Sequence, residues 1–315
     1  MTTRRRGALA TLASVAITLA LALSIAACGA TKVRDSLPAP TGNGGDGAPA
    51  TTPQAVAEAP PIVEIVVDDT GFTAPGTVPA GLKAMSLQNM GAKAHGAMLL
   101  KLHDNASRDQ VRTALADDPS GVTAFRLVTA SGGPGRLAPG SRQATYDTLS
   151  KGDYFIADPI VGPDNVMRID PNTLTSLVVT DPDPDAPSVA APASGLTARI
   201  TGTGIEIPPD LSAGGLTTLK VSNVGTQANE FSILKVDPVA TVDQARGFLL
   251  NAQPSGEAPF TFVGGGSAVE TGKTMLLSLD LPPGRYLVVS LLPNIVGGTD
   301  RPLVDGISAA LTVAS

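Results

Sequence analysis

The chain has 315 residues, 43% of them apolar and 3% aromatic, so it is long enough for two ordinary domains with cores of Ala, Val, Leu and Ile. Its 28 acidic residues exceed its 22 basic ones, which excludes a protein that binds nucleic acid through a basic surface. One cysteine and two histidines exclude a disulfide framework, a multi-cysteine metal cluster and most histidine-rich metal sites.

The first 27 residues predict an export signal. Three arginines at 4–6 precede an uncharged apolar run, which ends in Ile25-Ala26-Ala27-Cys28-Gly29. Small residues directly before a cysteine resemble the lipobox of bacterial lipoproteins. The resemblance implies that residues 1–27 are cleaved off as a lipoprotein signal peptide and that the Cys28 thiol is lipidated, with palmitate among the acyl groups. It also implies a protein anchored to the extracytoplasmic face of the cell membrane.

Two alternatives stay open for this segment. The apolar run over 7–27 is long enough to span a bilayer as an uncleaved anchor. Thr3-Arg4-Arg5 also hints at twin-arginine export. Cleavage before Cys28 would remove three arginines and no acid, so the net charge would fall from −6 to −9. Two acyl chains would hold such a chain to a membrane far better than one.

The segment 28–61 is predicted to be a flexible tether. It consists mainly of Ala, Gly, Pro, Thr and Asp, lacks aromatic residues and contains GNGGDG at 42–47. Such a composition cannot bury enough apolar surface to offset the entropy lost on ordering. The tether would let the folded part stand away from the membrane.

The rest of the chain repeats one pattern, which predicts domains at 62–181 and 196–315. Landmarks recur in the same order at an offset of 132 to 134 residues. They are Gly71-Phe72 with Gly204-Ile205, Asn89-Met90-Gly91 with Asn223-Val224-Gly225, Asp109-Gln110 with Asp243-Gln244, and Gly152-Asp153-Tyr154 with Gly284-Arg285-Tyr286. So many ordered matches indicate an internal duplication.

A linker rich in Pro, Asp and Ala at 182–195 separates the two copies. The run DPDPD at 181–185 could attract Ca²⁺, but its prolines oppose the tight loop that would gather the carboxylates. A solvated spacer is therefore favoured. Its length permits either a fixed pair of domains or two independent ones.

Each copy is predicted to contain β-strands and one short helix. Ser107 caps a helix over 108–116, and Thr241 caps a helix over 242–250, each with Asp and Gln in its first turn. Runs of β-branched and aliphatic residues predict strands at 62–67, 83–88, 97–102, 175–179, 231–236, 275–279 and 286–292. The glycine-rich runs 132–135 and 264–267 are predicted to be wide loops at equivalent places.

The order of these landmarks resembles the cupredoxin family: a strand, a turn ending in Gly, a strand ending in N-x-G, a histidine soon after, and a late G-x-Y strand. The resemblance covers nearly all of 62–181 and 196–315. It implies an all-β chain of two tandem Greek-key β-sandwiches (cupredoxin-like), each with one short helix, after a signal peptide and a disordered tether.

The resemblance also says where copper ligands would lie, since copper-binding members use two His, one Cys and one Met. His95 falls at the first histidine position, whereas the second copy has Asn229 there. The cysteine position, four residues after the tyrosine, holds Asp158 in the first copy and Ser290 in the second. Ile307 replaces the methionine in the second copy. Because a type 1 copper site needs a thiolate, we expect no cofactor and no metal.

A different metal site centred on His95 remains the alternative. His103 would lie about 26 Å from His95 along a continuous strand, so the two could not share an ion. Met98 would point to the opposite face, which leaves Met90 as a partner. The competing interpretation is a His95 packed at a sandwich end and hydrogen-bonded to backbone. The methionines would then fill the core: Met85, Met90, Met98 and Met167.

No motif pairs a nucleophile with a base, so the chain is expected not to be an enzyme. The leading hypothesis is a non-catalytic binding or scaffold lipoprotein of the cell envelope. Its longest loops, at 117–140 and 251–272, would offer two similar sites to an envelope protein partner. The alternative is a protein that binds copper or another metal ion through His95. An unrecognised enzyme acting on envelope glycans or lipids ranks last, and the oligomeric state stays open.

Overall fold

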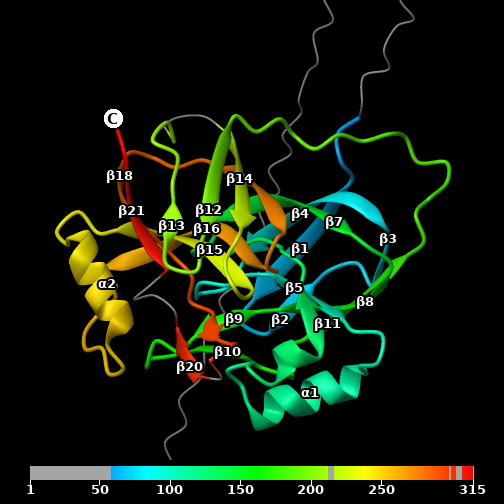
Figure 1. Ribbon diagram of the computed structural model, residues 1–315, viewed down its shortest axis with the longest axis horizontal. Coiled ribbons are helices and arrows are strands. Elements are labelled where there is room, and N and C mark those ends of the chain that lie inside the picture. The colour runs from blue at the N-terminus through cyan, green and yellow to red at the C-terminus, as the bar shows by residue number, and fades with distance from the viewer. Residues whose placement is uncertain (1–57, 212–215, 298, 303–306, 315) are drawn as a thin grey trace, which may run out of the picture. The chain divides into compact units, whose positions relative to one another are not determined.

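The computed structural model describes residues 58–211, 216–297, 299–302 and 307–314 (Figure 1). The predicted signal peptide, Cys28 and the tether up to residue 57 lie outside the described residues. Among the residues that are described, no helix has the length and apolar character needed to cross a bilayer. Ala55–Ser315 forms one compact unit.

The first half of this unit, residues 62–181, is a sandwich of two sheets. One layer has the strand order β2-β1-β4-β7 and the other the order β3-β11-β8-β5-β6. The first layer comprises β2 (Gly71–Thr73), β1 (Ile62–Asp68), β4 (Gly81–Asn89) and β7 (Arg142–Leu149). The second comprises β3 (Thr77–Pro79), β11 (Thr175–Thr180), β8 (Gly152–Ala157), β5 (Met98–Leu102) and β6 (Val128–Ala130). Side chains of both layers, such as Ile65, Met85 and Leu177, meet in one buried core.

The second half, residues 196–315, repeats the arrangement. Its layers have the orders β13-β12-β14-β17 and β16-β15-β18-β21. The strands are β12 (Leu196–Ile200), β13 (Ile205–Glu206), β14 (Thr217–Asn223), β15 (Asn229–Val236), β16 (Phe260–Val269), β17 (Thr274–Leu279), β18 (Gly284–Val289) and β21 (Ser308–Val313). Two small hairpins complete the chain: β9 (Pro159–Val161) with β10 (Met167–Ile169), and β19 (Pro293–Asn294) with β20 (Thr299–Pro302). The predicted all-β fold of two tandem sandwiches is confirmed.

Each half contains one short helix, as predicted, and this helix covers the outer face of the second layer. Helix α1 (Arg108–Asp117) begins after Ser107 and helix α2 (Val242–Leu250) after Thr241, and both have a complete capping box with the Gln at the third helical position. Leu115 of α1 packs with Phe155, and Leu249 of α2 packs with Leu287. A single-turn 3₁₀ helix over Ala124–Arg126 follows α1.

The repeated N-x-G landmark has a structural reason. The buried Asn89 side chain donates to the carbonyls of Lys93 and Leu137, and its oxygen accepts from Gly91 N. Asn223 makes the same three bonds to Gln227, Val269 and Gly225. The G-x-Y tyrosines likewise match, because each hydroxyl donates to a carbonyl four residues earlier, at Ser150 and Pro282. The landmarks are thus hydrogen-bonding devices that fix the loops of each sandwich.

The two halves are paired through their sheets, so they form a fixed pair and are not two independent domains. Strand β7 pairs antiparallel with β17, so the first layers join into one eight-stranded sheet running β13-β12-β14-β17-β7-β4-β1-β2 (Figure 1). Equivalent strands therefore lie at mirrored positions about the join. Such an order is that of two copies related by a local two-fold axis.

A second join corrects the prediction of two wide glycine-rich loops. Residues 131–137 run antiparallel to residues 263–269, with bridges at Ser131–Val269, Pro134–Gly266 and Leu137–Val263. Gly135 N donates to Gly265 O, and Ser267 N donates to Gly133 O. A side chain on Gly135 would lie 2.9 Å from the Gly265 carbonyl carbon. Glycine is needed here because the two backbones approach too closely for a Cβ.

Candidate functional site

His95 lies just before β5, at the end of the first sandwich. Its backbone exchanges two hydrogen bonds with Leu137, at 3.2 and 2.8 Å, and only 4% of the residue is exposed. The strand predicted at 97–102 is observed at Met98–Leu102, so residues 95–103 do not form one continuous strand. His103 follows the far end of β5, where its Nε2 lies 3.1 Å from Thr129 Oγ1. The two histidines thus belong to separate environments.

The His95 ring is held between two carboxylates. Nδ1 lies 2.6 Å from Asp158 Oδ2, and Nε2 lies 3.0 Å from Asp69 Oδ1. Asp158 is buried and also accepts from Gly96 N at 3.0 Å, while Asp69 accepts from Ala92 N. The expectation that His95 bonds backbone through its ring is therefore wrong. Its partners are side chains from two other loops.

These contacts favour the charged imidazolium. The hydrogen bond to Asp158 raises the pKa of His95 above 6.5, helped by Asp69 and opposed by burial. The backbone bond from Ala92 and the bond from His95 lower the pKa of Asp69. An imidazolium donates from both ring nitrogens, which matches a carboxylate on each side. The arrangement is an ionic bridge that links three loops, buried at His95 and Asp158 and exposed at Asp69.

Copper does not fit this constellation. The Asp158 carboxylate stands at the position that the sequence resemblance gave to the cysteine, and it lies 2.6 Å from His95 Nδ1. The second ring nitrogen is also bonded, and the two carboxylates lie on opposite sides of the ring, so no common point is free for an ion. No group of three or more His, Cys, Asp or Glu residues in the described ranges could hold a metal. A soft, sulfur-rich copper site requires a different donor set.

In the second half, the residues equivalent to His95 and Asp158 are Asn229 and Ser290, and they are also hydrogen-bonded, but as uncharged side chains. Ser290 Oγ donates to Asn229 Oδ1 at 3.2 Å, and Asn229 Nδ2 donates to Gln227 O at 3.0 Å. Both residues are completely buried. Sequence reasoning named these positions as lost copper ligands, but it did not foresee that they bond each other. Met98 and Met167 fill the core as expected, whereas Met90 is 61% exposed.

Sequence reasoning missed a buried ion pair between the halves. Arg136 Nη2 lies 2.6 Å from Glu230 Oε1, and both residues are at most 2% exposed. Arg136 also donates to Pro159 O at 2.8 Å and lies over the Phe262 ring at 5.0 Å. Glu230 accepts from Leu291 N at 2.8 Å. The repeat could not reveal this pair, because the residues equivalent to Arg136 and Glu230 are Ala268 and Gly96.

A buried acid near the same join was also missed. Asp147 accepts from Thr145 Oγ1 at 2.6 Å and from Gly133 N, and burial raises its pKa to about 6. A side chain on Gly132 would collide with its carboxylate. Leu279 stands at the equivalent place in the second half. The inner face of β7 is therefore polar where the inner face of β17 is apolar.

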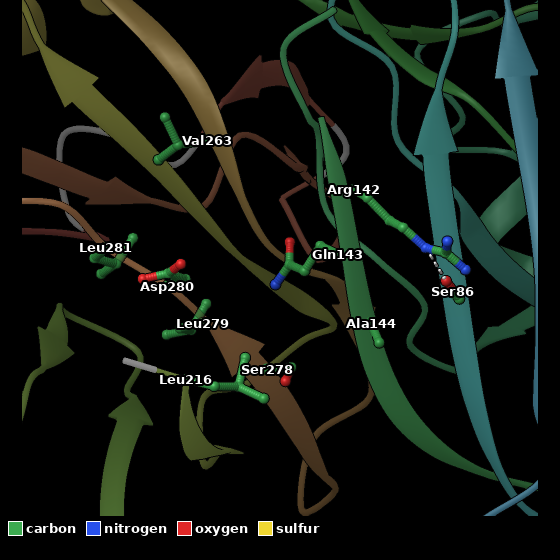
Figure 2. A pocket seen from close by; sticks show the side chains of 10 residues that line it. All are labelled: Ser86, Arg142, Gln143, Ala144, Leu216, Val263, Ser278, Leu279, Asp280 and Leu281. Atoms are coloured by element: carbon green, nitrogen blue, oxygen red, sulfur yellow. Dashed lines mark hydrogen bonds between the residues drawn. The ribbon is translucent and has the colours of Figure 1, made fainter. Parts of the chain in front are cut away.

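A pocket of about 300 Å³ opens between the two halves (Figure 2). Strands β4 and β7 contribute one wall, and β16, β17 and the residues after β17 contribute the other. The lining residues are Ser86, Arg142, Gln143, Ala144, Leu216, Val263, Ser278, Leu279, Asp280 and Leu281. The pocket forms only where the two halves meet, because each half contributes one of its walls.

No family model and no curated protein matches the chain. Solved structures do. A multicopper oxidase is 14% identical over 80% of this chain and 88% of its own, with a TM-score of 0.23. An auracyanin of Roseiflexus castenholzii is 15% identical over 39% of this chain and 100% of its own, with a TM-score of 0.24. Auracyanin B is 14% identical over 40% of this chain and 94% of its own, with a TM-score of 0.26. Since these TM-scores lie below one half, the solved structures carry no argument, and the resemblance to cupredoxins rests on the landmarks in the sequence.

Proposed function

We propose that the chain is a metal-free binding or scaffold module of the cell envelope, carried on a lipid at Cys28. The observation that supports it most is the closure of both copper-ligand positions by hydrogen bonds. His95 bonds Asp158 and Asp69, and Asn229 bonds Ser290. Groups that are engaged and buried in this way serve the fold and are not free to bind an ion.

The pairing of the two halves buries part of the surface that was predicted to bind a partner. Most of residues 131–137 and 263–269 are buried in the second join. They belong to the loops 117–140 and 251–272 that were expected to act as two equal sites. The remaining parts, 117–130 and 251–262, differ in structure, since only the first contains a 3₁₀ helix. One composite surface therefore suits this module better than two equal ones.

Lipidation is tested by expressing the full chain and its Cys28→Ser variant in a bacterium that acylates lipoproteins. We expect radioactive palmitate in the full chain alone, and a membrane-bound full chain that detergent releases. The variant should take up no label. Ser36→Cys in the Cys28→Ser background is the matched control, since it restores a thiol outside the lipobox and should remain unlabelled. A full chain without label would contradict the anchor.

Metal binding is tested on the chain from Gly29 onward, which contains the whole compact unit. It is incubated with Cu(I), Cu(II) or Zn(II), desalted, and its metal content measured. We expect less than one tenth of an ion per chain, equal in His95→Ala and in the control His103→Ala. One ion retained per chain and lost only in His95→Ala would replace this proposal by the metal-binding alternative.

A further inference from the structure

The pocket between the halves contains a polar group without a partner. Gln143 is 9% exposed, and its Nε2 has no hydrogen-bond partner. The orientation of the amide is fixed, because Gly265 N donates to Gln143 Oε1 at 2.9 Å and therefore requires the oxygen on that side. Figure 2 shows the amide nitrogen on the opposite side from the oxygen, turned toward the part of the pocket where Ser278 and Leu279 lie. A buried donor left unpaired carries a free-energy cost that a bound acceptor would remove.

The charges around the pocket narrow the choice of ligand. The Arg142 guanidinium at one wall is already paired with Glu64 and bonded to Ser86 at 3.0 Å. It therefore offers no free cation to an anionic ligand. At the other wall the exposed Asp280 carboxylate accepts no hydrogen bond from the described residues. The free polar groups are thus a donor, Gln143 Nε2, an acceptor, Asp280, and the Ser278 hydroxyl, which can donate or accept.

The remaining lining is aliphatic. Leu279 and Leu281 are buried in the wall, and Leu216 is 77% exposed at the rim. A ligand must therefore combine an acceptor, a donor and a face of C–H groups within about 300 Å³. Hydroxyl groups both accept and donate, and a pyranose ring presents C–H groups on one face. The chemistry matches a single neutral sugar residue.

We propose that the pocket between the halves binds one neutral sugar residue, with a hydroxyl oxygen accepting from Gln143 Nε2 and another hydroxyl donating to Asp280. Gln143 Nε2 is itself screened from water, so the ligand reaches it by displacing part of the aliphatic wall. Leu216 is the most exposed side chain of that wall. The inference rests on the proposed binding function and names its ligand class and its site.

The test uses the chain from Gly29 onward, labelled with ¹⁵N, and millimolar glucose, galactose or N-acetylglucosamine. We expect one of these sugars to shift the Gln143 side-chain amide signals, which are assigned by their loss in Gln143→Met. Methionine is the residue at the equivalent position, 275, so the variant should fold. It should weaken binding at least tenfold, and Asp280→Asn should weaken it less.

Gln253→Met, in an exposed loop, is the matched control and should bind as the unaltered chain does. Binding to Gln143→Met is read from the backbone amides of residues 279–281, which line the pocket in both chains. Sugar-induced shifts of these backbone amides that are as strong in Gln143→Met as in the unaltered chain, or no shift with any of the three sugars, would overturn the site. Shifts produced by ethanolamine but by none of the sugars would overturn the ligand class. Neither result changes the outcome of the metal-retention measurement, which tests the proposed function. The failure of this inference can therefore be distinguished from the failure of the proposed function.

Discussion

Thr145 of β7 lies directly opposite Leu277 of β17, and the two residues are equivalents of each other in the repeat. The same holds for Pro134 and Gly266 in the second join. A pair of equivalent residues can face each other only where a two-fold axis passes between them. The local axis therefore runs through both joins, and the chain has the architecture of a symmetric dimer whose subunits are fused.

The ion pair that breaks this symmetry should matter strongly for stability. Glu230→Gln leaves the buried Arg136 guanidinium without its counter-charge, and we expect the free energy of unfolding to fall by about 3–5 kcal/mol. Urea unfolding of the chain from Gly29 onward measures it. The exposed pair Arg142–Glu64 is the control, and Glu64→Gln should cost at most about 1 kcal/mol. Equal losses in the two variants would mean that the buried pair does not join the halves.

The glycines of the second join should be irreplaceable. A Cβ on Gly265 would collide with the Phe231 carbonyl oxygen, at a φ of +114° that other residues rarely adopt. We expect Gly265→Ala to lower the unfolding free energy by more than about 3 kcal/mol, since backbone would have to move. Gly247→Ala is the opposite control. Gly247 lies inside α2 with open space around its Cα, so alanine should add about 0.5–1 kcal/mol.

Local features of this fold were predictable, and features made by distant residues were not. The capping boxes of Ser107 and Thr241 span only three residues, so the sequence displays them directly. The His95 ring instead bonds residues 26 and 63 positions away, and Arg136 bonds a residue 94 positions away. No periodicity or motif encodes such pairings. Asp158 was noticed for its position, but its bond to His95 became visible only in three dimensions.

The His95 bridge predicts a decline of stability at alkaline pH. Because the folded-state pKa of His95 is raised above 6.5, its contribution is fully present below pH 6.5 and is lost as the pH rises through the folded value. The lowered pKa of Asp69 adds a loss as the pH falls below about 3.8. Unfolding free energies measured from pH 6.5 to 9 should fall, and His95→Gln should flatten the curve over this range. His103→Gln should leave the slope unchanged, and a flat curve for the unaltered chain would refute the imidazolium.

The charge of Asp147 destabilises the folded state, whereas the charge of His95 stabilises it, because the Asp147 carboxylate is buried and has no cationic partner among the described residues. Burial raises its pKa from 3.8 to about 6, so the folded state binds the proton more tightly than the unfolded state. Stability should therefore drop as the pH rises from about 4 to 6, and the full penalty of about 3 kcal/mol should persist above pH 6. Asp147→Asn keeps one oxygen that can accept from Gly133 N and gains an amide nitrogen that can donate to Thr145 Oγ1, but it cannot ionise, so it should stabilise the chain by up to this amount at pH 7.

The gain from Asp147→Asn should disappear below about pH 4, where the acid is protonated in the unfolded state as well as in the folded state. Urea unfolding at pH 3.5 and pH 7 separates this ionic effect from a packing effect, which would be the same at both values. Asp153→Asn is the control, since Asp153 is half exposed and pairs with Arg108 at the surface. It should change stability by less than about 1 kcal/mol at either pH. A loss of stability in Asp147→Asn at pH 7 would mean that the charged carboxylate is what holds residues 132–135 against β7.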